Sequence, residues 1–192
     1  MGYILPILAY LVGSLLFAKL IASIKGVDIS KIGSKNPGAT NIARALGFRW
    51  GLVVFLLDAS KGLLPTLFAK HFYGPESLIY ALTAIASVLG HNFPIYYGFR
   101  GGKGVATSFG IAVVFSPLGS MLSALIWGLV FWKTRISAIA SILAIISFVI
   151  ACAILKIPTY PMIASIFISA LIIIRHYPNI KRLIRGEEHS FR

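Results

Sequence analysis

Acidic residues and cysteine are scarce in this chain of 192 residues. It has 5 Asp and Glu residues against 18 Lys and Arg residues, and 12% of its residues are charged, whereas an average soluble domain carries about 25%. Cys152 is the single cysteine, which excludes a disulfide framework. No stretch is long and polar enough to form a separate soluble domain, so we expect residues 1–192 to form one transmembrane domain.

Long apolar runs dominate instead, and 58% of the residues are hydrophobic. A helix that crosses a membrane needs about 20 mostly apolar residues. Residues 105–132 are also apolar, but Ser116-Pro117-Leu118-Gly119-Ser120 interrupts them, which allows either one kinked helix or two short helices. The uninterrupted runs that we predict to be spans cover residues 3–24, 50–69, 78–97, 136–155 and 160–174.

The positions of the bases distinguish these two interpretations. With two short helices, nearly all Lys and Arg residues lie on one side of the membrane. The exceptions are Lys70 and Lys156, which lie on the other side, and Lys19 and Lys61, which lie inside spans. With one kinked helix, the same loop charges divide evenly. Cytoplasmic loops carry the excess of Lys and Arg. We therefore predict an all-α integral membrane protein with seven transmembrane helices, its N-terminus outside and its C-terminus cytoplasmic. Bases placed at span ends argue against nucleic acid as a partner.

The first candidate site is a glycine-rich loop on the predicted cytoplasmic side. Pro37 keeps Asn36 out of a helix, and Thr40 or Asn41 is expected to cap the helix that follows. A helix that starts here would direct its free N–H groups and its positive end at the loop, which suits phosphate. An ordinary basic connector is the alternative, but the density of hydroxyl, amide and cationic groups favours a site. The candidate residues are Gly33, Ser34, Lys35, Asn36, Gly38, Thr40, Asn41 and Arg44.

A second glycine-rich loop lies on the same predicted side. Three glycines around one lysine are typical of an anion-binding nest of backbone N–H groups. The Walker A pattern is absent, so a nucleotide is not implied. Alone, this loop is also compatible with a flexible turn; together with the first loop, it favours a phosphorylated substrate. The candidate residues are His91, Gly101, Gly102, Lys103, Gly104 and Thr107.

Further polar residues lie at the last span and inside two others. His176 and Asn179 follow the last span and add nothing to membrane orientation, so we consider them site residues. Asp58 and Lys61 are three residues apart within a span, and we expect them to pair and to support the site. The hydroxyls of Ser137 and Ser141 share one helix face, which we attribute to ordinary helix packing. The irregular or re-entrant cytoplasmic loops and the C-terminal segment are thus expected to converge on one site.

These segments together resemble the acyl-phosphate-dependent glycerol-3-phosphate acyltransferases of bacteria, the PlsY family. The matching text is GSKNPGATN at 33–41, LDASKG at 57–62, GHNFP at 90–94, GGKGVAT at 101–107 and RHYPNI at 175–180. The resemblance covers nearly the whole chain. It implies a transmembrane acyltransferase domain in the bacterial inner membrane, with the active site facing the cytoplasm and membrane lipid as its surroundings.

The resemblance also implies the reaction. A fatty acyl group would pass from acyl phosphate to the 1-hydroxyl of sn-glycerol 3-phosphate, giving lysophosphatidic acid and phosphate for phospholipid biosynthesis. Neither acyl-CoA nor acyl carrier protein would be required, and we expect no cofactor and no metal. Acyl phosphate already carries a good leaving group, so no covalent acyl-enzyme is needed. The residues expected to be catalytic are Ser34, Arg44, Lys103, His176 and Asn179.

Two assignments within this site stay open at the level of sequence. Lys103, its glycine neighbours and Arg44 would hold glycerol 3-phosphate, but the two phosphates can be exchanged. The residues that would shape the acyl-phosphate and oxyanion side are Ser34, Asn36, Thr40, His176 and Asn179. The base that takes the proton from the attacking hydroxyl is His176, His91 or the substrate phosphate.

Two other functions compete with acyl transfer. A membrane transporter of a phosphorylated solute would fit the cationic loops, but its outer side would be almost bare of polar groups. Inverted repeats, which would support transport, are not evident. A non-catalytic lipid-binding scaffold would favour denser basic clusters than these loops provide.

Overall fold

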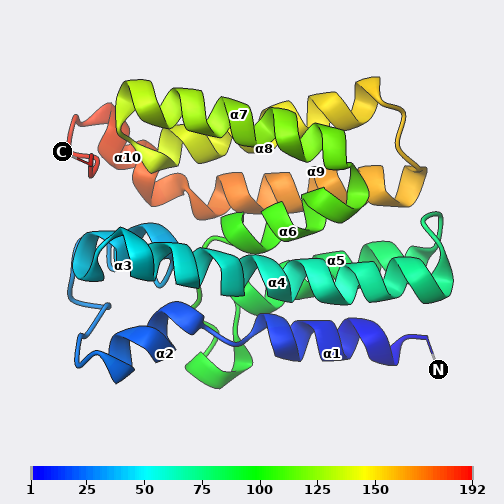
Figure 1. Cartoon of the computed structure of the whole chain (residues 1–192), viewed down its shortest axis with the longest axis horizontal. Helices are drawn as coiled ribbons and strands as arrows, with labels where there is room; N and C mark the ends of the chain where they lie inside the picture. Colours follow the sequence, from blue (N-terminus) through cyan, green and yellow to red (C-terminus); the bar gives the residue numbers. More distant parts are fainter. Residues whose placement is uncertain (1, 192) are drawn as a thin grey trace.

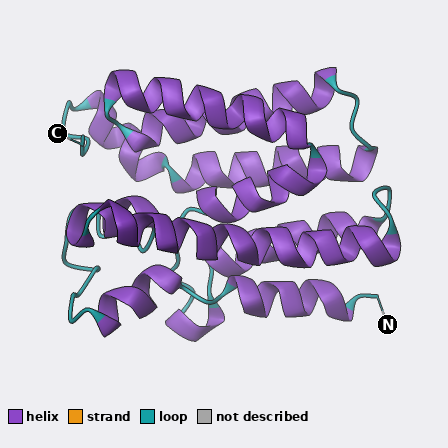
Figure 2. Cartoon of the chain, in the orientation of Figure 1, coloured by secondary structure: helices purple, strands orange, loops and turns teal. Residues whose placement is uncertain are grey.

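The computed structural model describes residues 2–191, and within that range it contains helices and loops but no strand (Figure 2). This agrees with the all-α prediction. Figure 1 shows the long helices running side by side along the long axis of the molecule. The elements are α1 (Ile4–Gly13), α2 (Phe17–Ile24), α3 (Ala39–Leu46), α4 (Phe48–Tyr73), α5 (Leu78–Asn92), η1 (Ile95–Tyr97), α6 (Val105–Phe115), α7 (Pro117–Thr134), α8 (Ser137–Ile154), α9 (Thr159–Arg175) and α10 (Tyr177–Ile184).

The first predicted span, residues 3–24, is broken into α1 and α2. The backbone leaves the helical region at Leu16, with φ −94° and ψ 88°. A break of this kind frees carbonyl groups, which are costly to leave unpaired inside a membrane. The carbonyl of Leu15 accepts a hydrogen bond of 2.5 Å from Nζ of Lys61 on α4. The buried lysine thus satisfies the break in the neighbouring span.

The ambiguous stretch 105–132 forms two helices, as the charge distribution favours. Pro117 disfavours helical backbone at Ser116, the residue before it, and is itself well suited to the first turn of a new helix. The hydroxyl of Ser116 accepts a hydrogen bond of 3.1 Å from the N–H of Gly119 and so caps α7. Helix α6 therefore ends at Phe115, and α7 begins at Pro117.

Helix length and apolarity account for only some of the seven predicted spans. Within residues 2–191, four helical segments are long and apolar enough to cross a membrane, namely Ile4–Ile24, Phe48–Tyr73, Leu78–Tyr97 and Ser137–Ile154. A fifth is formed if α9 and α10, which meet at an angle of 50°, count as one. Helix α6 has 11 residues and spans about 16 Å, roughly half of the hydrocarbon thickness.

Glycines bring the helices into close contact. A Cβ atom on Gly62 of α4 would lie 2.1 Å from the carbonyl oxygen of Thr107, and one on Gly110 of α6 would lie 2.0 Å from that of Ala59. Small residues of this kind let helix backbones approach closely in membranes. The close packing of α4 on α6 fixes the position of the second glycine-rich loop, which directly precedes α6.

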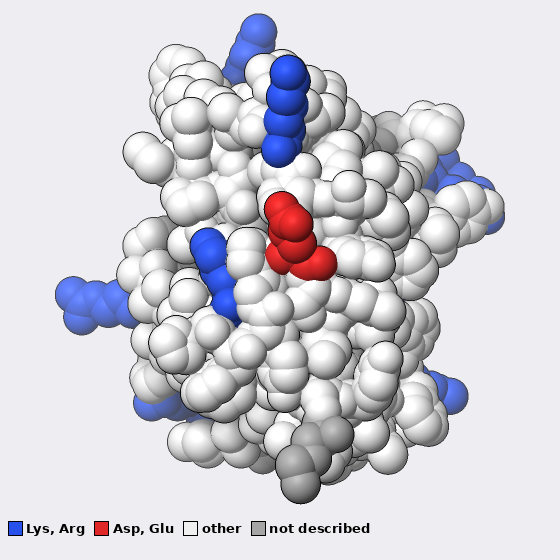
Figure 3. Space-filling model, turned by 90° about the vertical axis from the view of Figure 1, so that its right-hand side faces the viewer, with Lys and Arg blue, Asp and Glu red and all other residues white. Residues whose placement is uncertain are grey.

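The end of the molecule that holds the N-terminus carries few charged side chains (Figure 3). Figure 1 shows the N-terminus and the C-terminus at opposite ends, with α3 and α10 at the C-terminal end. Figure 3 looks onto the end that holds the N-terminus, where few charged side chains lie. The candidate residues of α3 and α10 belong to the opposite end.

Candidate active site

A cavity of about 120 Å³ lies where the two glycine-rich loops meet α8, the junction of α9 with α10, and the C-terminal segment. Polar and cationic side chains line most of it, with a few apolar groups on the side of α4 and α6. Its lining residues are Ser34, Asn36, Gly38, Ala39, Thr40, Asn41, Arg44, Phe55, Asp58, His91, Lys103, Gly104, Val105, Ala106, Trp127, Ser137, Ser141, His176, Asn179 and Glu188.

The first loop is shaped by Asn41, which is buried. Its amide oxygen accepts a hydrogen bond of 3.1 Å from the N–H of Ser34, and its amide nitrogen donates one of 2.9 Å to the carbonyl of Ile32. The expectation that Thr40 or Asn41 caps α3 is wrong, because the N-cap residue is Gly38 and no side chain caps the helix. Asn41 already lies inside α3, where its amide holds the loop and presents Ser34 to the cavity.

The second glycine-rich loop is held in place by hydrogen bonds that its backbone makes with Arg175 and His91. The guanidinium of Arg175 donates to the carbonyls of Gly101 (2.9 Å) and Gly102 (3.0 and 3.2 Å). The N–H of Gly102 donates to the carbonyl of His91 at 3.0 Å. A Cβ atom on Gly102 would lie 2.1 Å from Nε2 of His91. Glycine is therefore required at 102 by close packing against His91.

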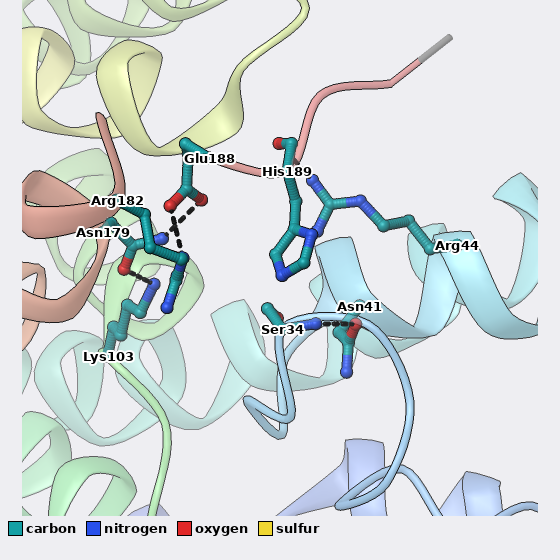
Figure 4. A network of polar contacts seen from close by, with 8 residues as sticks. All are labelled: Ser34, Asn41, Arg44, Lys103, Asn179, Arg182, Glu188 and His189. Atoms are coloured by element: carbon teal, nitrogen blue, oxygen red, sulfur yellow. Dashed lines mark hydrogen bonds and ion pairs between the residues drawn. The ribbon is translucent and has the colours of Figure 1, made fainter. Parts of the chain in front are cut away.

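Lys103 extends from this loop into a network with the C-terminal segment (Figure 4). Its ammonium donates to the amide oxygen of Asn179, whose amide nitrogen donates to Glu188 at 2.7 Å. The second oxygen of Glu188 accepts from Nε of Arg182 at 2.8 Å. Burial lowers the pKa of Lys103 from 10.5 to about 8, although the carboxylate of Glu188 acts in the opposite direction.

Arg44 lies on the opposite side of the cavity from Lys103 in Figure 4. Its guanidinium donates to the carbonyl of His189 at 3.0 Å and lies 4.4 Å above the ring of Phe191. Burial lowers the pKa of Arg44, but a guanidinium keeps its charge in proteins. The cavity is therefore bounded by two cationic side chains from distant parts of the sequence.

His176 is buried at the junction of α9 and α10 and lines the cavity. Its Nδ1 lies 2.8 Å from the carbonyl of Ile172. A carbonyl only accepts hydrogen bonds, so Nδ1 carries the proton and Nε2 of the neutral ring has a free lone pair. This arrangement leaves Nε2 of His176 able to accept a hydrogen bond from a hydroxyl group, while burial and the charge of Lys103 lower the pKa of the ring to about 4.

Asp58 and Lys61 form the predicted pair. Nζ of Lys61 lies 2.9 Å from Oδ1 of Asp58, and both side chains are buried. The same carboxylate oxygen lies 3.7 Å from Nδ1 of His91. Because His91 packs against Gly102, the pair on α4 supports the loop that carries Lys103.

The comparisons with known proteins agree with one another. A family profile described as "Glycerol-3-phosphate acyltransferase" matches residues 3–186. A protein named glycerol-3-phosphate acyltransferase from Aquifex aeolicus is 46% identical over 188 residues, which cover 97% of each chain. The protein of the same name from Hydrogenobaculum sp. is 40% identical over 191 residues and covers 100% of this chain and 97% of its own. The chain belongs to the glycerol-3-phosphate acyltransferase family.

Two solved structures extend this similarity to the fold. Both are described as PlsY (YgiH), an integral membrane glycerol 3-phosphate acyltransferase, and both are 44% identical to this chain and cover 100% of it. The glycerol 3-phosphate form has a TM-score of 0.98 with 96% of its chain covered. The lysophosphatidic acid form has a TM-score of 0.95 with 95% covered. The chain is thus an integral membrane acyltransferase of the PlsY family, and the transporter and scaffold alternatives are set aside.

Most of the site residues predicted from the sequence of this acyltransferase line the cavity: Ser34, Asn36, Gly38, Thr40, Asn41, Arg44, His91, Lys103, Gly104, His176 and Asn179. The others lie outside its lining, and their contact with substrate stays a prediction: Gly33, Lys35, Gly101, Gly102 and Thr107. Lys35 is exposed, and Thr107 is buried where α6 packs on Gly62. Gly33, Gly101 and Gly102 shape the two loops.

Several residues that line the cavity were not predicted as site residues from the sequence. Ser137 and Ser141, which the sequence pattern assigns to helix packing, both line the cavity, and the hydroxyl of Ser141 accepts a hydrogen bond of 3.1 Å from the indole of Trp127. Their spacing of four residues at the start of α8 is the available signal. Glu188 also lines the cavity, but no sequence pattern around it predicts this. Within residues 2–191, no group of three His, Cys, Asp or Glu side chains is placed to hold a metal ion.

Proposed function

We propose that this acyltransferase transfers a fatty acyl group from acyl phosphate to the 1-hydroxyl of sn-glycerol 3-phosphate, forming lysophosphatidic acid and phosphate. The observation that carries this proposal is that Ser34, Lys103 and His176, from three distant segments, line one cavity. The relatives named as glycerol-3-phosphate acyltransferases, and the PlsY structures in glycerol 3-phosphate and lysophosphatidic acid forms, support the acceptor and the product.

The polar and cationic groups of the cavity suit phosphate-bearing substrates. Lys103 and Arg44 bind the phosphate of glycerol 3-phosphate in this proposal, since an ion pair strengthens where water is excluded. Ser34, Asn36, Thr40 and Asn179 contact the acyl phosphate and supply hydrogen bonds to the developing oxyanion. No residue of the chain is required to become acylated, because the enzyme needs only to hold both substrates in reacting geometry.

His176 is the proposed acceptor of the hydroxyl proton. The oxygen of the 1-hydroxyl attacks the carbonyl carbon of acyl phosphate, the bond from that carbon to the phosphate oxygen breaks, and phosphate leaves with the electron pair. The hydroxyl proton moves to Nε2 of His176, whose lone pair is left free by the contact of Nδ1 with Ile172. His91 is less suited to this role, because its Nε2 packs against Gly102.

The proposed setting is the inner membrane of a bacterium, with residues 1–192 as a single transmembrane acyltransferase domain. Seven passages with the N-terminus outside would place the cavity at the cytoplasmic surface. Two observations support this orientation: the termini lie at opposite ends of the molecule, and the N-terminal end carries few charges (Figures 1 and 3). The short α6 would then cross where the bilayer is locally thin, with α7 as its partner in a hairpin.

The donor can be tested with the purified protein. We expect lysophosphatidic acid from glycerol 3-phosphate and palmitoyl phosphate, and none from palmitoyl-CoA or palmitoyl acyl carrier protein. Intact-mass spectrometry of the protein with donor alone should show no added acyl group. Product from acyl-CoA alone, or a stable acyl-protein that reacts with acceptor, would refute the proposed donor or the direct transfer.

A further inference from the structure

Residues 187–191 follow α10 and pass from one side of the polar cavity to the other, and we refer to them as the C-terminal strap. Gly186 turns the chain out of α10, since its φ is 70° and the N–H of Glu187 donates to the carbonyl of Arg182 at 2.8 Å. This is the Schellman arrangement, which ends many helices. The end of α10 itself therefore sets the direction in which the strap leaves the helix.

The strap makes hydrogen bonds on both sides of the cavity. Glu188 accepts a hydrogen bond of 2.7 Å from Asn179, on the side where Lys103 lies. The carbonyl of the next residue, His189, accepts one of 3.0 Å from Nη2 of Arg44 on the opposite side (Figure 4). Two successive residues of the strap thus join α10 to α3.

Phe191 anchors the strap at the junction of α7 with α8. Its N–H donates to the carbonyl of Arg135 at 2.8 Å. Its ring packs edge-on against that of Phe131, with 5.4 Å between the ring centroids, and Phe131 in turn stacks on Trp127 at 4.8 Å. These contacts fix both the backbone and the ring of Phe191.

The guanidinium of Arg44 lies against this fixed ring. Cζ of Arg44 is 4.4 Å from the ring centroid of Phe191. A cation is attracted to the face of an aromatic ring, and the attraction grows where the pair is shielded from water. An arginine side chain that is free to change rotamer loses conformational entropy when a ligand orders it. The contacts with His189 and Phe191 order Arg44 before any ligand binds.

The N–H groups of Arg44 that the strap leaves unused suit phosphate. A guanidinium has five N–H donors in one plane, and the carbonyl of His189 takes one of them at Nη2. Nε of Arg44 is buried and has no hydrogen-bond partner among the described residues, and the side chain lines the polar cavity. Because a guanidinium often binds phosphate oxygens through two parallel N–H groups, the orientation of its plane decides how well it binds.

We propose that Phe191 is a positioning residue, which holds the guanidinium of Arg44 in the orientation that binds the phosphate of glycerol 3-phosphate. The inference rests on the proposed function, which assigns this phosphate to Arg44 and Lys103. Phe191 lies outside the lining of the polar cavity and acts through Arg44. Loss of its ring therefore weakens binding of the acceptor and leaves the groups around the donor and the reacting hydroxyl unchanged.

The test compares Phe191→Leu with Phe191→Tyr in the purified protein. Leucine keeps an apolar side chain without a ring, so we expect KM for glycerol 3-phosphate to rise about fivefold, as the loss of a partly shielded cation–π contact implies. In the same variant, kcat and KM for palmitoyl phosphate should change less than about twofold, because neither depends on Arg44 in the proposed site. Tyrosine keeps the ring and should hold KM for glycerol 3-phosphate within about twofold of the wild-type value.

Phe48→Leu is the matched control, because Phe48 at the start of α4 is 77% exposed. It should leave all three constants unchanged, and thermal unfolding checks that every variant folds. An unchanged KM for glycerol 3-phosphate in Phe191→Leu, an equal rise in Phe191→Tyr, or a fall in kcat alone would overturn the inference. A wild-type protein that makes no lysophosphatidic acid from palmitoyl phosphate would instead overturn the proposed function, so the two failures are distinguishable.

Discussion

The surroundings of Lys103 differ from those of Lys35, although each lysine lies in a glycine-rich loop. Lys103 reaches the cavity and bonds to Asn179, whereas Lys35 is exposed. A cation that binds phosphate at a site shielded from water contributes more than one at the surface, where water and salt screen its charge. The difference leads to a direct comparison of the two residues.

Lys103→Ala should lower kcat/KM for glycerol 3-phosphate by about 10- to 100-fold, because a hydrogen bond to a charged group contributes about 1.5–3 kcal/mol. Lys35→Ala is the comparison variant and should change kcat/KM less than about twofold, because Lys35 is exposed and lies outside the cavity lining. A large loss in this variant would favour the prediction from sequence that Lys35 binds substrate. Steady-state kinetics in detergent, with thermal unfolding to check that both variants fold, make the comparison. Equal losses in the two variants would contradict the proposed phosphate contact.

The pKa of Lys103 gives a prediction for pH dependence. Burial lowers this pKa to about 8, so the ammonium is charged below that pH and loses its charge above it. The phosphate of glycerol 3-phosphate is a dianion above about pH 6. We therefore expect KM for glycerol 3-phosphate to be lowest between about pH 6 and 8 and to rise above pH 8. Lys103→Arg should abolish the rise near pH 8, since arginine stays charged; an unchanged rise in this variant would assign it to another group.

The packing of single elements decides where these side chains lie. Helix α4 contacts α6 through Gly62 and Gly110, and the loop before α6 is fixed by His91 on α5 and Arg175 on α9. The pair of Asp58 and Lys61 supports the same loop from α4. The position of Lys103 is therefore fixed by the packing of four helices, α4, α5, α6 and α9, and not by its own loop alone.

Gly102→Ala tests this support. The added Cβ would lie 2.1 Å from Nε2 of His91, so the loop must move and Lys103 with it. We expect activity to fall at least about tenfold, in line with the cost of overpacking. Gly128→Ala on α7 is the control, because a Cβ atom there meets nothing within 4 Å. Full activity of Gly102→Ala would mean that the position of the loop is not critical.

Several elements could be predicted from the sequence, because apolar run length and charge asymmetry report directly on membrane insertion. The pairing of Asp58 with Lys61 followed from their spacing of three residues on one helix face, and the interruption at Pro117 marked the end of α6. The direction in which the side chains of the two loops point could not be predicted from the sequence. Lys35 and Lys103 look alike in sequence, and only tertiary packing turns one outward and the other into the cavity. Trp127 and Glu188 reach the cavity from elements far along the chain, which no local pattern indicates.

At the scale of the whole molecule, the polar groups of the site come from α3, the loop before α6 and the junction of α9 with α10. Figure 1 shows α3 and α10 at one end of the helix bundle, and the termini at opposite ends. The positive-inside rule would then place the cavity at the cytoplasmic surface. In a Cys152→Ser background, the Lys35→Cys variant should react with a membrane-impermeant thiol reagent only after cells are opened. The Glu76→Cys variant, in the loop between α4 and α5, should react in intact cells. The reverse pattern would contradict the proposed orientation.

The central claim is that one cavity, lined by Ser34, Lys103 and His176, is where the acyl group passes from acyl phosphate to glycerol 3-phosphate. The most direct measurement is the release of phosphate from palmitoyl phosphate by the purified protein, with and without glycerol 3-phosphate, together with the amount of lysophosphatidic acid formed. We predict that release depends on the acceptor and that one phosphate appears for each lysophosphatidic acid. Release that proceeds equally well without glycerol 3-phosphate, or that is not matched by lysophosphatidic acid, would contradict the account.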